Sequence, residues 1–220
     1  MNARPAVAPA RRARSGPKRG GTSGRRSAGP RSQLRREDWI LAARTTLIRD
    51  GINAVNVLPL AGKLKVTRGG FYWHFRNRAD LLDALLADWE ANNTAAFEKV
   101  IAEGGRDGRA EFVAMVDVWV AEHDYDPAWD AAVRQWALQS PRVARVVKLV
   151  DEHRIELFRQ IFLDLGYVDP EALVRARITY FHQVGYYTLG LGESHEERMR
   201  LLPYYLSSLM GSAHDDRRSG

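Results

Sequence analysis

Residues 56–75 constrain the fold most, because their pattern predicts two short helices joined by a tight turn. Asn56 is a residue type that is preferred at the N-cap of a helix. Leu60 and Leu64 then form an apolar pair four residues apart, as one face of a helix requires. Thr67 can cap the second helix after the turn. This order is that of a helix-turn-helix unit, whose second helix enters the major groove of DNA.

The second predicted helix has two unlike faces. Phe71 and Phe75 lie four residues apart and face one way, whereas Arg68, Tyr72 and Trp73 lie on the opposite side. On a solvated surface the Tyr and Trp side chains would expose apolar area without benefit. Against a nucleic acid, Arg68 can bind guanine or phosphate, Tyr72 can donate to a phosphate oxygen, and Trp73 can lie against a thymine methyl or a sugar.

Neighbouring residues are expected to complete the DNA contacts. Gly69 and Gly70 each cost about 1 kcal/mol of helix propensity relative to alanine, and they leave room where a backbone must approach another molecule. The residues expected to position phosphates are Asn56, Lys65, His74 and Arg78. The full predicted DNA-binding set is Asn56, Lys65, Thr67, Arg68, Gly69, Gly70, Tyr72, Trp73, His74 and Arg78.

Residues 36–86, and above all the motif VTRGGFYWHFRNRADLL at 66–82, resemble the DNA-binding domain of the TetR family of bacterial transcriptional regulators. The resemblance implies nine helices, three of them in the DNA-binding domain, and a ligand cavity whose occupancy re-orients the DNA-binding heads. Two positions depart from the family pattern. Gly70 stands where Ser or Thr is frequent, and Leu58 where a polar or basic residue is common. Both departures remove hydrogen-bonding groups and favour readout through DNA shape.

From about residue 35 the chain reads as helical nearly throughout, with neither strand alternation nor a solenoid repeat. Capping residues mark successive helix starts, and three of them precede a proline. These starts are Asn77, Asp126-Pro127, Ser140-Pro141, Asp169-Pro170 and Ser194. We predict an all-α fold with an N-terminal three-helix helix-turn-helix DNA-binding domain at 35–80. A six-helix ligand-binding and dimerisation domain is predicted at 81–214, between a disordered basic arm at 1–34 and a disordered tail at 215–220.

Two helices near the C-terminus carry apolar and aromatic residues around most of their circumference. One side can pack on the chain's own core, and the other then needs a partner. We therefore predict a homodimer through a four-helix bundle built from two copies. A well-buried monomeric core is the alternative. The predicted interface residues are Ile178, Phe181, Tyr187, Leu201, Tyr205 and Leu209.

The middle helices contain many aromatic residues and a few polar ones, a composition typical of sites for largely apolar small molecules. By the resemblance, the candidate ligand-binding residues are Trp89, Trp119, His123, Trp136, His153 and Phe158. The alternative is that these are core aromatics and core histidines with satisfied hydrogen bonds. The effector itself is not identified by any motif.

The net charge of +6 is unevenly distributed. Residues 1–34 contain nine basic residues and no acidic one, residues 35–80 contain nine basic and four acidic ones, and the remainder is therefore −8. The positive potential needed for a phosphate backbone is thus confined to the first 80 residues. The arm at 1–34 adds phosphate contacts, or it is a solvated leader, or it results from a misplaced start codon. A transit peptide is disfavoured by its Pro and Gly content.

Several functional classes lack support in the sequence. There is no cysteine, no apolar run of the ~20 residues that span a bilayer, and no secretion signal, so we expect a cytoplasmic protein without a membrane association. No His-x3-His pair, catalytic constellation or nucleotide loop appears, so we expect no metal, no cofactor and no enzyme. The predicted function is a dimeric repressor that binds double-stranded DNA at a palindromic operator and is released by a small, largely apolar effector. An effector-independent architectural protein and an activator are the alternatives.

Overall fold

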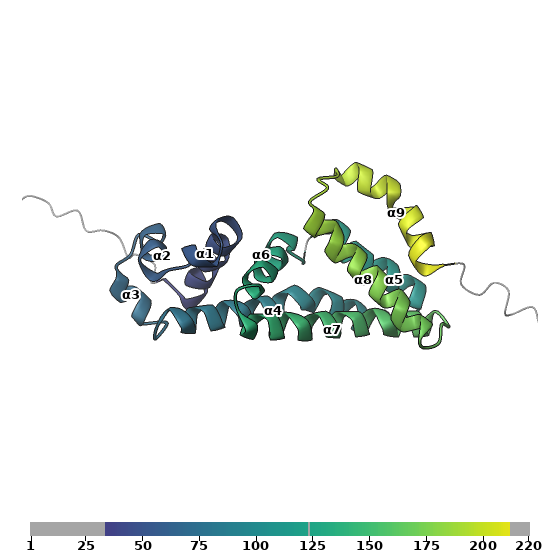
Figure 1. The fold of residues 1–220 in the computed structure, drawn as a ribbon, viewed down its shortest axis with the longest axis horizontal. Coiled ribbons are helices and arrows are strands. Elements are labelled where there is room, and N and C mark those ends of the chain that lie inside the picture. Colours follow the sequence, from purple (N-terminus) through teal and green to yellow (C-terminus); the bar gives the residue numbers. More distant parts are fainter. Residues whose placement is uncertain (1–33, 123, 212–220) are drawn as a thin grey trace, which may run out of the picture. The chain divides into compact units, whose positions relative to one another are not determined.

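The computed structural model describes residues 34–122 and 124–211 of the chain. Within these ranges the secondary structure is nine α-helices and one short 3-10 helix, with no strand, which confirms the predicted all-α fold (Figure 1). The predicted tail at 215–220 and the predicted arm, apart from its last residue, lie outside the described residues. Among the described residues no helix combines the length and the hydropathy needed to cross a membrane.

The first three helices form the predicted helix-turn-helix unit. Helix α1 (Arg36–Asp50) leads through η1 (Ile52–Ala54) to α2 (Val57–Lys63) and α3 (Arg68–Tyr72). In the turn between α2 and α3, Lys65 adopts a left-handed backbone with φ of 55°, and the Val66 N–H donates to the Ala61 carbonyl at 3.0 Å. Asn56 and Thr67 occupy the N-cap positions as predicted, but neither side chain caps its helix.

Six longer helices follow. They are α4 (Arg78–Glu103), α5 (Gly108–Ala121), α6 (Pro127–Ala137), α7 (Pro141–Asp164), α8 (Glu171–Leu189) and α9 (His195–Met210). The side chains of Asn77, Asp126, Ser140 and Ser194 each accept a backbone N–H of the first turn, which confirms four of the predicted starts.

The fifth predicted start is shifted by one residue. Pro170 is the N-cap of α8 and not its first residue, and the Asp169 carboxylate binds Arg159 on α7. The start of α5 was not predicted. Asp107 caps it, and Gly108 follows because an added Cβ there would lie 2.8 Å from the backbone nitrogen of Leu165. Glycine thus permits the close approach of α5 to the end of α7.

Two apolar cores hold these helices together. The first joins the helix-turn-helix unit to α4, α6 and α7, and its fully buried members include Trp39, Phe71, Leu81 and Val133. The second lies among α4, α5, α7 and α8 and includes Phe97. Because the first core contains residues of both the DNA-binding unit and the following helices, the unit is packed on the rest of the chain and is not tethered through α4 alone.

Candidate nucleic-acid interface

Helix α3 stands on a buried aromatic platform. The side chains of Phe71 and Phe75 are 0% and 1% exposed, and their rings stack at 5.4 Å. The Trp39 ring of α1 meets the Phe71 ring edge-on at 5.3 Å. Aromatic pairs at these separations stabilise the fold beyond the contribution of burying their apolar surface. A helix of only five residues is marginal by itself, so this platform is what holds α3 in place.

The opposite face of α3 is open to solvent. Trp73 is 89% exposed and Tyr72 is 48% exposed, values that are unusual for such large aromatic side chains. Arg68 donates to the Tyr72 hydroxyl through Nε at 3.2 Å and through Nη2 at 2.8 Å. The hydroxyl oxygen accepts both of these bonds, so its own hydrogen remains available for a further acceptor. The two side chains form an exposed, ordered pair of hydrogen-bond donors.

The glycines of α3 are not required by the chain's own packing. A Cβ added at Gly69 would lie 3.6 Å from the Thr67 hydroxyl, and one added at Gly70 would lie 4.0 Å from the Val66 Cβ. These are ordinary van der Waals distances, so alanine would fit at either position. Neither residue has a positive φ that would demand glycine.

Arg78 and Asn56, two of the predicted phosphate contacts, also form hydrogen bonds within the chain. Arg78 is half-buried, and its guanidinium donates to the carbonyls of Val55 at 2.6 Å and Ile52 at 2.8 Å. The Asn56 side chain donates to the Asn53 carbonyl at 2.6 Å. Both side chains therefore hold the connection between η1 and α2. Lys65 and Thr67 are exposed, and His74 is half-buried.

The DNA-binding unit is also joined to the rest of the chain by charge. Arg44 on α1 forms an ion pair with Asp126, the N-cap of α6, and its guanidinium lies 3.8 Å from the Trp129 ring centroid. The Asp126 backbone N–H donates in turn to the Asn93 side chain of α4 at 3.3 Å. One ion pair thus leads from α1 into a larger group of buried polar residues.

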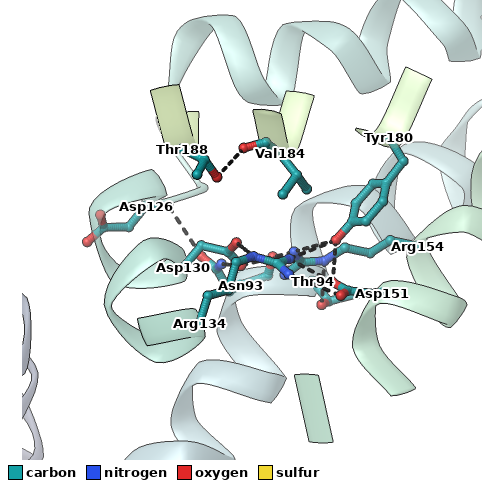
Figure 2. A network of polar contacts seen from close by, with 10 residues as sticks. All are labelled: Asn93, Thr94, Asp126, Asp130, Arg134, Asp151, Arg154, Tyr180, Val184 and Thr188. Atoms are coloured by element: carbon teal, nitrogen blue, oxygen red, sulfur yellow. Dashed lines mark hydrogen bonds and ion pairs between the residues drawn. The ribbon is translucent and has the colours of Figure 1, made fainter. Parts of the chain in front are cut away.

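That group is a buried polar network among α4, α6, α7 and α8 (Figure 2). Arg154 on α7 is 1% exposed, and it donates to the Asp130 carboxylate at 3.1 Å and to the Asn93 carbonyl at 2.8 Å. The Asn93 side chain also donates to Asp130, at 3.0 Å. Burial alone would raise the pKa of Asp130, but the nearby charges of Arg154 and Arg134 outweigh it and hold that pKa below its usual range.

Arg134 extends the network to α8. It donates to Asp130 at 2.6 Å, to both carboxylate oxygens of Asp151 at 2.7 and 3.0 Å, and to the Tyr180 hydroxyl at 3.0 Å. Tyr180 donates to Asp151 at 2.7 Å, and burial raises the pKa of Tyr180 to about 12. The hydroxyl therefore stays protonated at neutral pH, and two carboxylates balance two guanidinium groups.

Sequence reasoning missed this network, although a signal was present. The buried stripe of α7 is formed by Val143, Val147, Val150, Arg154, Phe158 and Ile161. Its spacing of three and four residues places Arg154 directly in an apolar row. Asp130 lies in the same way between the buried Trp129 and Val133 of α6. A charged residue in an apolar row of one helix predicts an opposite charge in the row of another.

The predicted ligand-binding residues do not gather around one site. Trp89 and Trp136 belong to the first core, whereas Trp119 and Phe158 belong to the second, where their rings stack at 5.0 Å. His153 is on the surface, where its Nε2 contacts the Glu98 carboxylate at 2.9 Å. His123 lies outside the described residues.

Of these residues, Trp119 lines a cavity of about 50 Å³ between α5, α8 and α9. Trp89, Trp136 and Phe158 are buried in the two cores and do not line this cavity. The two remaining histidines give no support to a shared pocket, since one is on the surface and the other is outside the described residues.

The predicted interface residues fall into two groups. Ile178 and Phe181 on α8 are 54% and 59% exposed, and Val174 continues their row at 49%. Tyr187 instead points inward, because its hydroxyl donates to the Trp119 carbonyl at 2.8 Å. On α9, Leu201 is half-buried, and both Tyr205 and Leu209 line the cavity against α5 and α8.

An exposed donor face on a short helix, held by a helix-turn-helix unit that is packed on a larger helical domain, defines a DNA-binding transcriptional regulator. Residues 40–85 match the family model described as bacterial regulatory proteins, tetR family. This match assigns residues 40–85 to the TetR-type DNA-binding domain that the resemblance predicted. The matched family and structures are regulators and not enzymes, which agrees with the expected class.

Solved structures with the same fold include three regulators at low sequence identity. A TetR-family regulator from Streptomyces coelicolor is 15% identical with a TM-score of 0.67, covering 81% of this chain and 95% of that one. The ketosteroid transcriptional regulator of Mycobacterium tuberculosis is 12% identical with a TM-score of 0.62, covering 80% and 94%. The fatty acid degradation regulator of Bacillus halodurans is 15% identical with a TM-score of 0.60, covering 80% and 95%.

Proposed function

We propose that this protein is a cytoplasmic, homodimeric repressor that binds a palindromic operator and is released by a small, largely apolar effector. The observation that carries the proposal is the outer face of α3, where Arg68, Tyr72 and Trp73 are exposed above a fully buried aromatic platform. Exposing this much aromatic area is unfavourable in water and becomes favourable when the face is covered by a duplex.

Arg68 and Tyr72 are the proposed readers of base edges and backbone. Their hydrogen bonds to each other hold the guanidinium over α3, so little side-chain entropy remains to be lost on binding. Lys65 and Thr67, which precede α3 and are exposed, are proposed to contact phosphates. Arg78 and Asn56 are proposed to support DNA binding indirectly. They hold the connection between η1 and α2 and do not contact the DNA themselves.

A second copy of the chain is the proposed partner for the exposed row on α8. Val174, Ile178 and Phe181 follow one another at the spacing of a single helix face, and they leave a continuous apolar surface in water. Two recognition helices on successive major grooves, about 34 Å apart, give an affinity that one short helix does not reach. The twofold axis of the dimer would match the symmetry of a palindromic operator.

The dimer is tested by sedimentation of a double variant. Ile178→Glu with Phe181→Glu should yield monomers, because two carboxylates would be buried against their own copies. Leu138→Glu, at a residue that is 78% exposed and outside α8, is the matched control and should leave the dimer intact. A dimer that persists in the double variant would place the interface elsewhere.

Response to a small molecule is supported by the aromatic interior and by the names of similar regulators, two of which refer to ketosteroids and fatty acid degradation. Sequencing the genomic fragments that bind the purified protein tests the whole proposal. A twofold-symmetric site beside a small set of genes is the expected result. Binding spread over the genome without a common site would instead favour the architectural alternative.

A further inference from the structure

The cavity between α5, α8 and α9 contains an amide without a partner. Gln183 on α8 lines this cavity, and its Nε2 is buried with no hydrogen-bond partner among the residues that the structure describes. An unpaired buried donor is destabilising, so such groups are rare in folded proteins unless a ligand or water satisfies them. The rest of the lining is mainly apolar and includes Val116, Val120, Leu206 and Leu209.

Two other polar residues of the cavity are already engaged in hydrogen bonds. Arg198 donates to the Glu122 carboxylate at 2.8 Å and to the Trp119 carbonyl at 3.0 Å, so its charge is balanced. Thr179 donates to the Arg175 carbonyl at 2.9 Å. Burial lowers the pKa of His182, although the Glu193 carboxylate opposes this, so the imidazole is neutral at pH 7.

We infer that this cavity is the effector site, and that its ligand is an uncharged, largely apolar molecule that presents a carbonyl oxygen to Gln183. This inference rests on the proposed ligand response and adds the place and the chemical class. A carboxylate would meet the Glu193 side chain and an arginine that is already paired. An ammonium has donors only, so it would leave the Gln183 Nε2 unpaired. A neutral carbonyl satisfies the amide and leaves the apolar walls to the rest of the ligand.

The cavity holds about 50 Å³, far less than the ~300–1,000 Å³ of sites for drug-sized ligands. A longer ligand therefore has to displace a wall, and α9 is the wall that can yield. Met210 is its one buried residue among those described, and Pro203 interrupts its backbone hydrogen bonding. Because α9 packs against α8, which carries the proposed dimer row, its displacement offers a route from ligand to operator.

The test compares three nine-carbon probes by calorimetry on the full-length dimer: 2-nonanone, nonanoate and 2-aminononane. The neutral ketone should bind most tightly. Gln183→Leu keeps the side-chain volume but removes the amide, and should weaken ketone binding about five- to tenfold, the equivalent of one hydrogen bond. Gln160→Leu on the exposed face of α7 is the matched control and should leave it unchanged.

Hydrogen exchange locates the site independently of these affinities. 2-Nonanone should change the exchange of residues 195–210 in the wild type, and Val120→Phe, which fills the cavity, should abolish both binding and this change. Tighter binding of either charged probe, equal ketone affinity in Gln183→Leu, or no binding by ketones of seven to eleven carbons would each overturn the inference. If the ketone binds here without releasing operator DNA, the site stands and the proposed repressor mechanism fails. If operator binding is intact but ketones do not bind, only this inference fails.

Discussion

Arg68 on α3 and Arg154 on α7 are the same residue type in opposite settings. Arg68 is exposed, and its guanidinium is held by the hydroxyl of the neighbouring Tyr72. Arg154 is 1% exposed, and it is bound by Asp130, by the Asn93 carbonyl and by other groups of the buried polar network. The first has donors left for another molecule, whereas the second has committed its donors to the fold.

The comparison separates binding from stability. Removal of a buried charge leaves its partner uncompensated in a medium of low polarity, so the cost appears in folding. Removal of an exposed charge changes little in the isolated protein, and the cost appears only when the partner molecule is present. The surface of α3 and the network between α4, α6, α7 and α8 should therefore respond in opposite ways to the same kind of substitution.

The largest effect is expected for Asp130→Asn. This change removes the carboxylate shared by Arg154 and Arg134 (Figure 2). It leaves the buried Arg154 with neutral partners only, and the half-buried Arg134 with Asp151. We expect the free energy of unfolding to fall by about 3–5 kcal/mol in urea titration. Glu152→Gln is the control, because Glu152 forms an exposed ion pair with Lys148 on α7. This substitution should change the free energy of unfolding little. Equal effects of the two substitutions would show that burial does not decide the outcome.

The acid dependence of this variant follows from the lowered pKa of Asp130. A carboxyl whose pKa is lower in the folded state contributes its full stabilisation above its unfolded pKa of about 3.9, and loses it as the pH falls through the folded pKa. The stability difference between wild type and Asp130→Asn should therefore be constant near neutral pH and narrow below about pH 4. A stability difference between the two proteins that widens as the pH falls would contradict a lowered pKa of Asp130.

An intermediate effect is expected for Arg68→Ala, and it should appear on DNA alone. Loss of the main base reader should weaken operator binding by about 1–3 kcal/mol, measured by fluorescence anisotropy on the mapped site. Thermal unfolding should stay close to that of the wild type, because the side chain is exposed. Arg76→Ala, just beyond α3 and also exposed, is the control for charge. If both variants lose affinity equally at the operator and on random DNA, Arg68 contacts phosphate and does not read bases.

The helix-turn-helix unit was predictable because its determinants are local. The positions of Phe71 and Phe75 and the turn before Thr67 lie within a few residues of one another, and helical spacing alone divides the buried face from the exposed one. Arg78 shows the limit of this reasoning. Its partners are 23 and 26 residues away, so nothing near it in the sequence indicates that it binds backbone carbonyls of its own chain.

The C-terminal part was less predictable because its contacts join distant segments. Arg154 meets Thr94 across 60 residues, and Arg134 meets Tyr180 across 46. Aromatic composition indicated that Trp89 and Trp119 would be buried, but not that they would enter different cores. Which aromatics pack together depends on helix crossings that periodicity does not encode.

A smaller effect is expected for Arg44→Gln, which tests the link between the two regions. The substitution removes the ion pair with Asp126 and the contact of the guanidinium with the Trp129 ring. Because the pair is partly exposed, we expect a loss of about 1 kcal/mol in the free energy of unfolding. Arg49→Gln, in an exposed contact with Asp50 on the same helix, is the control. If α1 transmits changes at α6, Arg44→Gln should also reduce effector-driven release of DNA, which Arg49→Gln should not do.

The smallest effect on stability is expected for Gly70→Ala, and this substitution should stabilise the protein instead of destabilising it. The added Cβ would meet the Val66 Cβ at 4.0 Å, so it fits, and alanine favours the helix by up to about 1 kcal/mol. We therefore expect α3 to become slightly more stable, measured as a higher midpoint of thermal unfolding. Operator affinity should nevertheless fall, because the methyl group would stand between the α3 backbone and the duplex. A variant that gains stability and keeps its affinity would show that the backbone of α3 does not closely approach DNA, and that the surface contact is made by side chains alone.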